Sequence, residues 1–442
     1  MKRNTSMTRN TMIRMSVVTA GVAAALMLPS AAWGEDWKVH VIDGEGVGAD
    51  GVRLADVNGD GLLDIASGWE QQKEVRAYIH PGAENATQPW PKVVVGTSEA
   101  SSGTGGPEDA FFSDLDGDGA FDVVSSWESS EIFIHWAPAD PDAYLDEDAW
   151  TTEVLPASQI TKWLIAAPMQ IDGKNGPDLV AGAKAGYKSD EVVWFESPAD
   201  PRNLSAWKSH VMTDQAGWMM GLLPEDMDGD GDPDALLGVR KEDKGVKWLE
   251  NPGPGEQQTQ KWTVHDLSDG TNGAGFVTTA DLDQDGLEDV LAPVMKPSVE
   301  GEGILQIFRR LEQDGSDWQT IEIGLPDPKV GKYGKGVAVG DIDLDGRNDV
   351  VVTYEYGPMY LMQHDGNIGP GHWTHQRIGN GSKFDDVMLY DIDQDGDLDA
   401  LTTDENDRQV IWFENPAREV PEPATLGLLG LGGAVMLAGR RR

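Results

Sequence analysis

With 442 residues, 76 Asp and Glu against 34 Lys and Arg, and a formal net charge of −42, the chain is long and strongly acidic. This charge excludes nucleic acid as a default partner, because phosphate backbones are bound by Lys and Arg, and the absence of cysteine excludes disulfides and cysteine-ligated metal centres. The 53 glycines predict many tight turns, and 16 tryptophans are too many for a disordered acidic chain.

The first 34 residues have the parts of a secretory signal peptide. Four basic residues and no acid lie within Met1–Arg14, and the apolar stretch Val17–Leu28 follows. This stretch is short for a membrane span, and the small residues Ala32 and Gly34 precede a predicted cleavage site. We therefore expect residues 1–34 to be removed on export; the alternative is a retained N-terminal anchor.

One acidic nonapeptide recurs through the rest of the chain at intervals of 50 to 60 residues. The seven copies begin at Asp56, Asp114, Gln170, Asp226, Asp281, Asp341 and Asp391. Short apolar or alternating runs flank each copy, and a run that starts with tryptophan, such as Trp37–Ile42, completes each period. Four short strands per period, without helical periodicity, are typical of a β-propeller blade.

The phase of the repeat predicts how the ring closes. The first tryptophan strand precedes the first acidic loop, and the last period stops after its third strand, at Asn415. We therefore expect Trp37–Ile42 to complete the last blade and to close the ring by hydrogen bonds. The sequence thus predicts an all-β fold: a single seven-bladed β-propeller of four-stranded blades over residues 35–417, followed by a separate tail over 418–442.

Six of the seven copies carry the oxygen ligands that calcium requires. Calcium takes six to eight oxygens, and these copies place Asp or Asn at positions 1, 3 and 5, glycine at position 6 and aspartate at position 9. An EF-hand is excluded because position 12 is never glutamate and strands flank the loops. We expect about six structural calcium ions, one in each such loop. The predicted ligands are Asp56, Asn58, Asp60 and Asp64; Asp114, Asp116, Asp118 and Asp122; Asp226, Asp228, Asp230 and Asp234; Asp281, Asp283, Asp285 and Asp289; Asp341, Asp343, Asp345 and Asp349; and Asp391, Asp393, Asp395 and Asp399.

The third copy departs from this pattern. Gln170 and Lys174 replace the acids at positions 1 and 5, whereas Asp172 and Asp178 are kept. We therefore expect no calcium in this loop, where the ammonium group of Lys174 could stand in for the ion.

The seven copies and their flanking strands resemble FG-GAP/VCBS-type repeats, the calcium-bearing propeller blades also found in integrin heads. The resemblance covers nearly all of the chain between the signal peptide and the tail. It implies a propeller and structural calcium. It does not single out a function, because such propellers serve as adhesins, lectins, scaffolds and, in a few cases, lyases or dehydratases.

The face opposite the acidic loops is the predicted binding face, because the loops between strands 2 and 3 and the blade-to-blade connections lie there. Aromatic residues stand beside charges in these segments, a mixture that suits sugar rings, and the scarce bases gather in blades 3 to 6, which would favour an anionic glycan. The alternative is that the tryptophans pack between blades and the bases form surface ion pairs. The candidate ligand-binding residues are Trp69, Glu108, Asp109, Trp163, Trp218, Arg240, Lys241, Tyr333 and Lys335.

No sequence motif marks a catalytic residue. The chain has no G-x-S-x-G, H-E-x-x-H or P-loop motif. His40, His210 and His265 each stand three residues after a strand-opening tryptophan, which indicates a structural position in the blade. We expect a non-catalytic binding, adhesion or scaffold protein whose ligand is a polysaccharide or a protein. The alternative is a carbohydrate-active enzyme, a polysaccharide lyase or sugar dehydratase, that uses the central channel face.

The C-terminal segment has three parts in order: the triplet Pro421–Pro423, the apolar run Leu426–Gly439 and the basic end Arg440–Arg442. It resembles the PEP-CTERM sorting tail of Gram-negative bacteria. The resemblance implies removal by an exosortase-type peptidase and delivery to the cell surface or extracellular matrix; the alternative is an uncleaved membrane anchor. We expect the mature protein to be a monomer whose partner is a polysaccharide or a surface protein.

Overall fold

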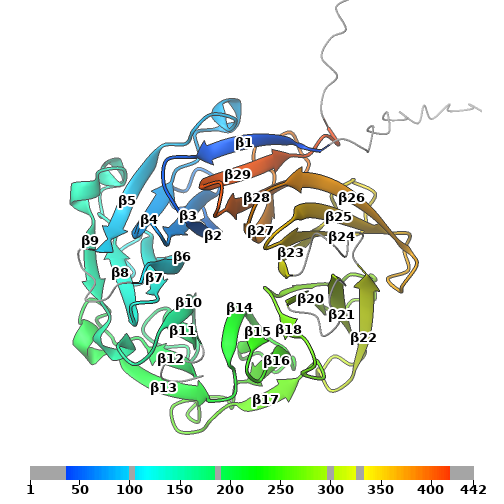
Figure 1. The fold of residues 1–442 in the computed structure, drawn as a ribbon. Helices are drawn as coiled ribbons and strands as arrows, with labels where there is room; N and C mark the ends of the chain where they lie inside the picture. Colours follow the sequence, from blue (N-terminus) through cyan, green and yellow to red (C-terminus); the bar gives the residue numbers. More distant parts are fainter. Residues whose placement is uncertain (1–35, 99–104, 185–190, 296–302, 325–332, 419–442) are drawn as a thin grey trace, which may run out of the picture.

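The computed structural model describes residues 36–98, 105–184, 191–295, 303–324 and 333–418, which form a closed ring of seven β-sheets (Figure 1). The predicted signal peptide and almost all of the predicted tail lie outside the described residues. Each sheet is one blade, with its first strand at the centre of the ring and its fourth at the rim. The predicted seven-bladed β-propeller is confirmed.

The strands of each blade follow one another from the centre of the ring outward. Blade 1 consists of β2 (Ala49–Ala55), β3 (Asp64–Trp69), β4 (Glu74–Tyr78) and β5 (Lys92–Thr97). Blade 2 consists of β6 (Pro107–Ser113), β7 (Asp122–Trp127), β8 (Glu131–Trp136) and β9 (Thr151–Val154). Blade 3 consists of β10 (Trp163–Met169), β11 (Asp178–Ala183), β12 (Val192–Glu196) and β13 (Lys208–Thr213). Blade 4 consists of β14 (Trp218–Glu225), β15 (Asp234–Lys241), β16 (Gly245–Glu250) and β17 (Thr263–Asp266). Blade 5 has an inner strand divided into β18 (Gly273–Ala274) and β19 (Thr278–Ala280), followed by β20 (Asp289–Met295), β21 (Ile304–Arg310) and β22 (Trp318–Gly324). Blade 6 consists of β23 (Gly334–Gly340), β24 (Asp349–Tyr354), β25 (Pro358–His364) and β26 (Trp373–Asn380). Blade 7 consists of β27 (Phe384–Tyr390), β28 (Asp399–Asp404), β29 (Gln409–Glu414) and β1 (Lys38–Asp43).

Helical structure among the described residues is limited to short 3₁₀ turns, and no helix there is long and apolar enough to cross a membrane. These turns are η1 (Ala83–Asn85), η3 (Pro141–Ala143), η4 (Glu147–Ala149), η5 (Pro156–Ser158) and η6 (Leu204–Ala206).

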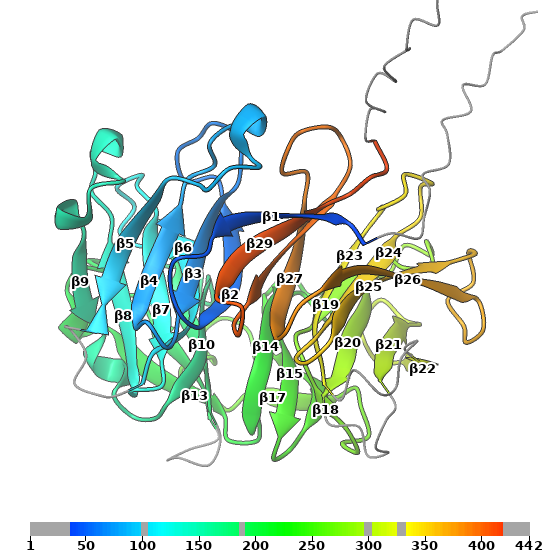
Figure 2. The ribbon, with the colours of Figure 1, turned by 45° about the horizontal axis from the view of Figure 1, so that its top comes forward.

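The N-terminal strand closes the ring, as the repeat phase predicts. β1 pairs antiparallel with β29, from Lys38 opposite Glu414 to Asp43 opposite Val410, and Figure 2 shows the two strands side by side. The start of β1 and the end of β29 therefore lie together. Both are on the face that carries the acidic loops, because Asn415 donates its backbone N–H to Asp399 of the seventh loop, at 2.9 Å.

Burial explains why each strand has its sequence pattern. The second strands are enclosed by neighbouring blades on both faces, and β24, with the sequence DVVVTY, is buried at every position. Such strands read as continuous apolar runs. The outer strand β22 has one solvent-facing side and alternates buried and exposed residues over its second half. The apolar core consequently lies between blades, as where Leu401 and Trp412 of blade 7 pack with Ile65 and Trp90 of blade 1.

Three blades contain the same histidine–tryptophan–glutamate contact. His40 stacks on Trp412 at 4.4 Å between ring centroids and lies 2.5 Å from Glu414. His210 contacts Trp194 and Glu196 in blade 3, and His265 contacts Trp248 and Glu250 in blade 4. The three histidines thus link strands 3 and 4 of their blades, which agrees with the predicted structural role.

Candidate calcium loops and a charged channel mouth

The acidic loops connect the first and second strands of each blade, and loop 1 to loop 7 denote those of blades 1 to 7. Loop 4 shows their shared geometry. Asp226 accepts the N–H of Gly231 at 3.1 Å, Asp228 accepts that of Asp230 at 3.1 Å, and Asp230 accepts that of Asp232 at 2.9 Å. These bonds require a left-handed residue at position 6, whose φ lies between +87° and +97° in all six acidic loops, so glycine is favoured there.

The loops contain buried oxygens that the protein itself does not satisfy. Asp114, Asp341 and Asp391 at position 1, and Asp283 at position 3, each keep a buried Oδ1 without a hydrogen-bond partner. In four loops, one oxygen from each of three carboxylates lies within 4.8 Å of the others, as for Asp226, Asp228 and Asp230. A buried carboxylate oxygen without a partner is costly. Converging oxygens of this kind fit a hard cation such as calcium.

The aspartate at position 9 has a structural role that the sequence analysis missed. Asp64 accepts the N–H of Val57 at 3.0 Å and that of His80, just beyond β4, at 2.8 Å. Six of the seven blades have both bonds. Burial raises the pKa of Asp64 to about 6 and that of Asp399 to about 8. The sequence does contain one sign of this role: the third copy lacks the acids at positions 1 and 5 but still has aspartate, Asp178, at position 9.

That third copy provides a direct prediction. Asp178 accepts the N–H groups of Ile171 at 3.0 Å and of Ser197 at 2.7 Å. Asp178→Ala leaves both without an acceptor, and we expect a loss of about 2–4 kcal/mol in the free energy of unfolding, measured by denaturant titration with chelator present. Asp172→Ala removes a carboxylate whose partners are the N–H and ammonium groups of the exposed Lys174, which water can satisfy, and should cost less than about 1 kcal/mol. Equal losses would contradict this role for position 9.

The opposite mouth of the central channel holds a cavity of about 200 Å³. Its walls come from the starts of the inner strands, at the ends remote from the acidic loops. The apolar residues of the lining come from blades 3 to 5 and include Leu164, Met220, Phe276 and the half-buried Trp218, with Lys184 and Arg240 beside the Trp218 ring. The charged residues of the lining include Asp50, Glu108, Lys335 and Asp385 from blades 1, 2, 6 and 7.

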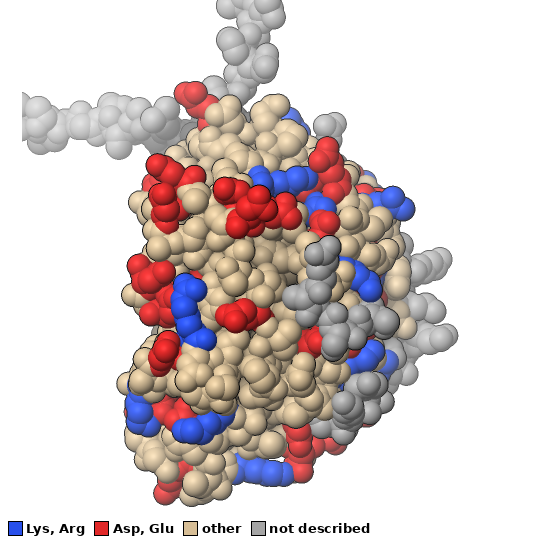
Figure 3. Space-filling view, turned by 90° about the vertical axis from the view of Figure 1, so that its left-hand side faces the viewer, with Lys and Arg blue, Asp and Glu red and all other residues tan. Residues whose placement is uncertain are grey.

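The bases at this mouth are paired with acids. Lys335 Nζ lies 2.5 Å from Asp385 and 3.8 Å from Asp50, and Arg240 lies 3.5 Å from Glu355. The predicted positive zone is therefore neutralised, and acids outnumber bases in the cavity lining. On the outer wall in Figure 3, acidic groups likewise stand with bases between them.

Two carboxyl groups in the cavity lining differ in their pKa. Burial, together with the negative charge of Asp385, raises the pKa of Asp50 well above its usual range. Although burial would raise it as well, the pKa of Asp385 is lowered because the charge of Lys335 and a hydrogen bond from Asp50 favour its ionised form. Of the two carboxyl groups, Asp50 is therefore the one that binds a proton more readily.

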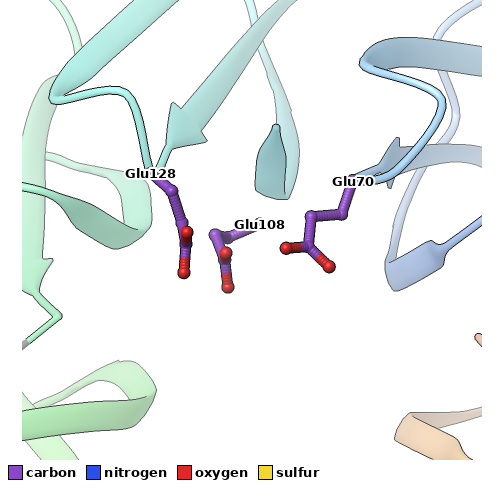
Figure 4. A group of neighbouring side chains, drawn as sticks. All are labelled: Glu70, Glu108 and Glu128. Carbon is purple, nitrogen blue, oxygen red and sulfur yellow. The ribbon is translucent and has the colours of Figure 1, made fainter. Parts of the chain in front are cut away.

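Three glutamates converge beside this pair. Figure 4 shows Glu70, Glu108 and Glu128 turned toward one another from blades 1 and 2, with one oxygen of each within 4.8 Å of the others. Lys184 contacts both Glu108 and Glu128, so an ammonium group already neutralises part of this charge. Burial raises the pKa of Glu108 to about 7. We assign no metal to this group.

A buried arginine connects three blades below the mouth. Arg53 of β2 lies 2.6 Å from Asp109 of β6 and 2.8 Å from Asp386 of β27. All three side chains are buried, and the guanidinium group also lies over the ring of Phe111, at 4.8 Å. The sequence contains no local signal for this pairing, because the three residues come from separate repeats.

The predicted ligand-binding residues divide into three groups. Glu108, Asp109, Trp218, Arg240 and Lys335 line the cavity. Two more lie beside it: the Lys241 ammonium is 3.9 Å from the Trp218 ring centroid, and Arg240 is 5.7 Å from that of Tyr333.

The other two tryptophans correct the prediction, because Trp69 and Trp163 are both 0% exposed. Trp69 donates to Tyr78 at 2.9 Å, and Trp163 donates to the backbone of Ser158 at 2.8 Å. They pack inside the ring and are not available to a ligand.

Comparison with known proteins identifies the repeats and the tail. A family model described as FG-GAP-like repeat matches residues 56–125, 226–292 and 341–402, and the PEP-CTERM protein-sorting motif matches residues 419–442. A search of curated proteins found no match. Among solved structures, the chain is similar to one titled "Crystal structure of BBS1N in complex with ARL6DN, soaked with mercury", at 12% identity and a TM-score of 0.46, over 86% of this chain and 96% of that chain.

The sorting motif indicates a bacterial protein that is secreted, targeted to the cell surface and processed by an exosortase at its C-terminus. The matched FG-GAP-like repeats agree with the ring of seven four-stranded blades, and both are consistent with a protein targeted to the cell surface. The chain is thus a seven-bladed β-propeller in which residues 56–125, 226–292 and 341–402 match FG-GAP-like repeats and residues 419–442 match the PEP-CTERM sorting motif.

Proposed function

We propose that the protein is a calcium-stabilised binding or scaffold protein of the cell surface or extracellular matrix of a Gram-negative bacterium. Residues 1–34 are its signal peptide, residues 35–417 are the propeller, and the segment from 418 is the sorting or anchor segment. The mature protein acts without catalysis, as a monomer, and its acidic loops hold calcium. The observation that carries the binding role is the cavity at the channel mouth, on the face remote from those loops.

The lining of the cavity supports a polysaccharide as the ligand. A sugar ring has an apolar face that packs on an aromatic side chain and hydroxyl groups that bond to charged side chains, and here Trp218 and Phe276 line the same cavity as Asp50 and Lys335. Because the bases are paired with acids, the cavity suits a neutral sugar better than the uronate favoured by the sequence. A side chain of a surface protein is the other ligand that this mouth accommodates.

Trp218 is the residue whose loss tests this site. We expect Trp218→Ala to weaken glycan binding about tenfold or more, because the variant removes the exposed aromatic surface of the cavity lining. A glycan array with the calcium-loaded protein identifies the ligand, and a titration of that glycan gives the change in affinity. Tyr356→Ala is the matched control, since Tyr356 is 52% exposed and does not line the cavity.

Two results would count against this proposal. Glycan binding that survives Trp218→Ala would place the ligand elsewhere. A folded, calcium-loaded protein that retains no glycan would leave a protein scaffold as the function.

A second candidate, a polysaccharide lyase or sugar dehydratase, is favoured by one observation. Asp50 and Asp385 border the cavity, and burial beside the charge of Asp385 raises the pKa of Asp50; a carboxyl group with a raised pKa in a pocket can act as a general acid. Turnover of the retained glycan, followed as ultraviolet absorbance of an unsaturated product or as loss of water by mass spectrometry, tests it. Activity abolished by Asp50→Asn would support the enzyme; retention without turnover would exclude it for that glycan.

A further inference from the structure

The acidic loops differ in whether their outward oxygens are free. The hydrogen bonds within five of the six acidic loops use Oδ1 at positions 3 and 5, as Asp228 and Asp230 show in loop 4. Loop 5 uses Oδ1 of Asp285 at position 5, whereas Oδ1 of Asp283 at position 3 has no partner. The Oδ2 atoms of Asp228 and Asp230 have no partner among the described residues. They are therefore the oxygens that a bound cation would share with position 1.

Loop 3 shows what happens when a side chain supplies that cation. Asp172 accepts the N–H of Lys174 with Oδ1, in the standard pattern, at 3.0 Å. Its Oδ2 lies 2.6 Å from Lys174 Nζ. The ammonium group thus takes the oxygen that the loop leaves free, in the one loop that lacks the full ligand set.

Arginine does the same in loops 2 and 5. Arg202, from the connection after β12, contacts Oδ2 of Asp116 and lies 3.7 Å from Oδ2 of Asp118. Arg309, near the end of β21, contacts Oδ2 of Asp283 and lies 2.9 Å from Oδ2 of Asp285. Arg202 is also held over the ring of Trp136, at 4.6 Å, which fixes it beside the loop.

Loop 6 is closed by residues of its own blade. Arg347, at position 7, contacts Oδ2 of Asp345. Gln363 donates to Oδ2 of Asp343 at 2.8 Å and to Asp349 at 3.3 Å. Both outward oxygens are therefore occupied.

The carboxylates of loops 1, 4 and 7 are not paired with such a cation, although the guanidinium group of Arg418 stands beside Gly396 of loop 7. Within the part of the chain that the structure describes, no Lys or Arg side chain forms an ion pair with their carboxylates. Blades 4 and 7 instead have Glu250 and Glu414 at the strand-3 position that Arg309 occupies in blade 5. Oδ2 of Asp60 in loop 1 accepts the neutral side-chain amide of Asn58, at 3.1 Å.

We propose that the chain divides its acidic loops into two classes: loops 1, 4 and 7 bind calcium tightly, whereas loops 2, 5 and 6 are closed by arginines tethered within the protein. This inference rests on the calcium binding proposed above. The closed loops bind weakly, because calcium must displace a guanidinium group or accept its repulsion. Arg202 and Arg309 are thus residues that set metal affinity.

The test counts calcium bound to the full chain by equilibrium dialysis, after chelator treatment and dialysis into metal-free buffer. Wild type should show three tight ions, one for each open loop, and weaker binding by about tenfold or more elsewhere. Arg309→Gln and Arg202→Gln should each add one tight ion, and the double variant two. Arg377→Gln is the matched control, because Arg377 pairs with Asp36 at 2.8 Å and forms no ion pair with a carboxylate of an acidic loop.

Aspartate variants identify the loop that gains the ion. Asp226→Asn, in open loop 4, should remove one tight ion from wild type. Asp281→Asn, in loop 5, should remove none from wild type but should remove the ion gained by Arg309→Gln. The melting temperature provides a second readout: Arg309→Gln should lower it in chelator and recover with calcium, since the ion replaces the lost positive charge.

The outcomes separate this inference from the function on which it rests. Tight ions in all six loops, with the arginine variants unchanged, would overturn the division into two classes and leave calcium binding intact. A folded protein that binds no calcium in any variant would overturn both.

Discussion

Chelation of calcium is expected to lower the melting temperature of the ring by about 10 °C or more. A site held at about 1,000 times its dissociation constant contributes about 4 kcal/mol to the stability of the folded state. Three such sites therefore contribute about 12 kcal/mol, which is comparable to the total stability of a typical domain. The loss is expected at the open loops, where Asp391 of loop 7 has a buried oxygen for which the described residues provide no hydrogen-bond partner.

The measurement is a circular dichroism melt in calcium and again in excess chelator. Magnesium should restore little of the loss, because it requires a smaller octahedral shell and gives up its water reluctantly. Calcium added back should restore all of it. An unchanged melting temperature in chelator would show that the loops are acidic turns without a metal role.

Arg53→Met is expected to cost about 3–5 kcal/mol in the free energy of unfolding. The variant keeps the volume of the side chain but leaves Asp109 and Asp386 buried without their partner. Removing one member of a buried charge group costs this much because the charges left behind are neither hydrated nor paired. The lost interactions join blades 7, 1 and 2, and blade 7 contains the β1–β29 pair that closes the ring.

An exposed ion pair provides the control for this variant. Arg377→Met breaks the pair with Asp36, whose side chains are 52% and 37% exposed, and should cost less than about 1 kcal/mol. Adding Asp109→Asn and Asp386→Asn to Arg53→Met should recover part of the loss, because the uncompensated charges are then absent. Equal losses for the two arginine variants in denaturant titrations would show that burial does not strengthen the Arg53 group.

The fold could be predicted because the repeat encodes it locally. Each period contains its own strands, its glycine turn and the tryptophan that begins its last strand, so seven periods predict seven blades. The phase of the repeat also predicts that β1 pairs with β29, since the last period lacks a fourth strand. Each of these inferences depends on residues close together in the chain.

The candidate site could be predicted only in part, because it depends on contacts between repeats. Trp69, Trp163 and Trp218 look alike in sequence. The structure buries the first two and leaves the third beside the cavity. The bases of blades 3 to 6 looked like a positive zone, but their partners, such as Glu355 for Arg240, come from distant positions. Ion pairs between residues of different blades leave no local pattern in the sequence.

The two ends of the ring lie together on the acidic-loop face, since Lys38 is opposite Glu414 and Asn415 bonds to the seventh loop. Whatever holds the sorting segment therefore holds the propeller by that face. The acidic loops are turned toward the attachment point, where anionic lipids or polymers would repel them unless divalent ions intervene. The channel mouth lies on the opposite face, so a propeller held through its sorting segment would keep that mouth away from the attachment point.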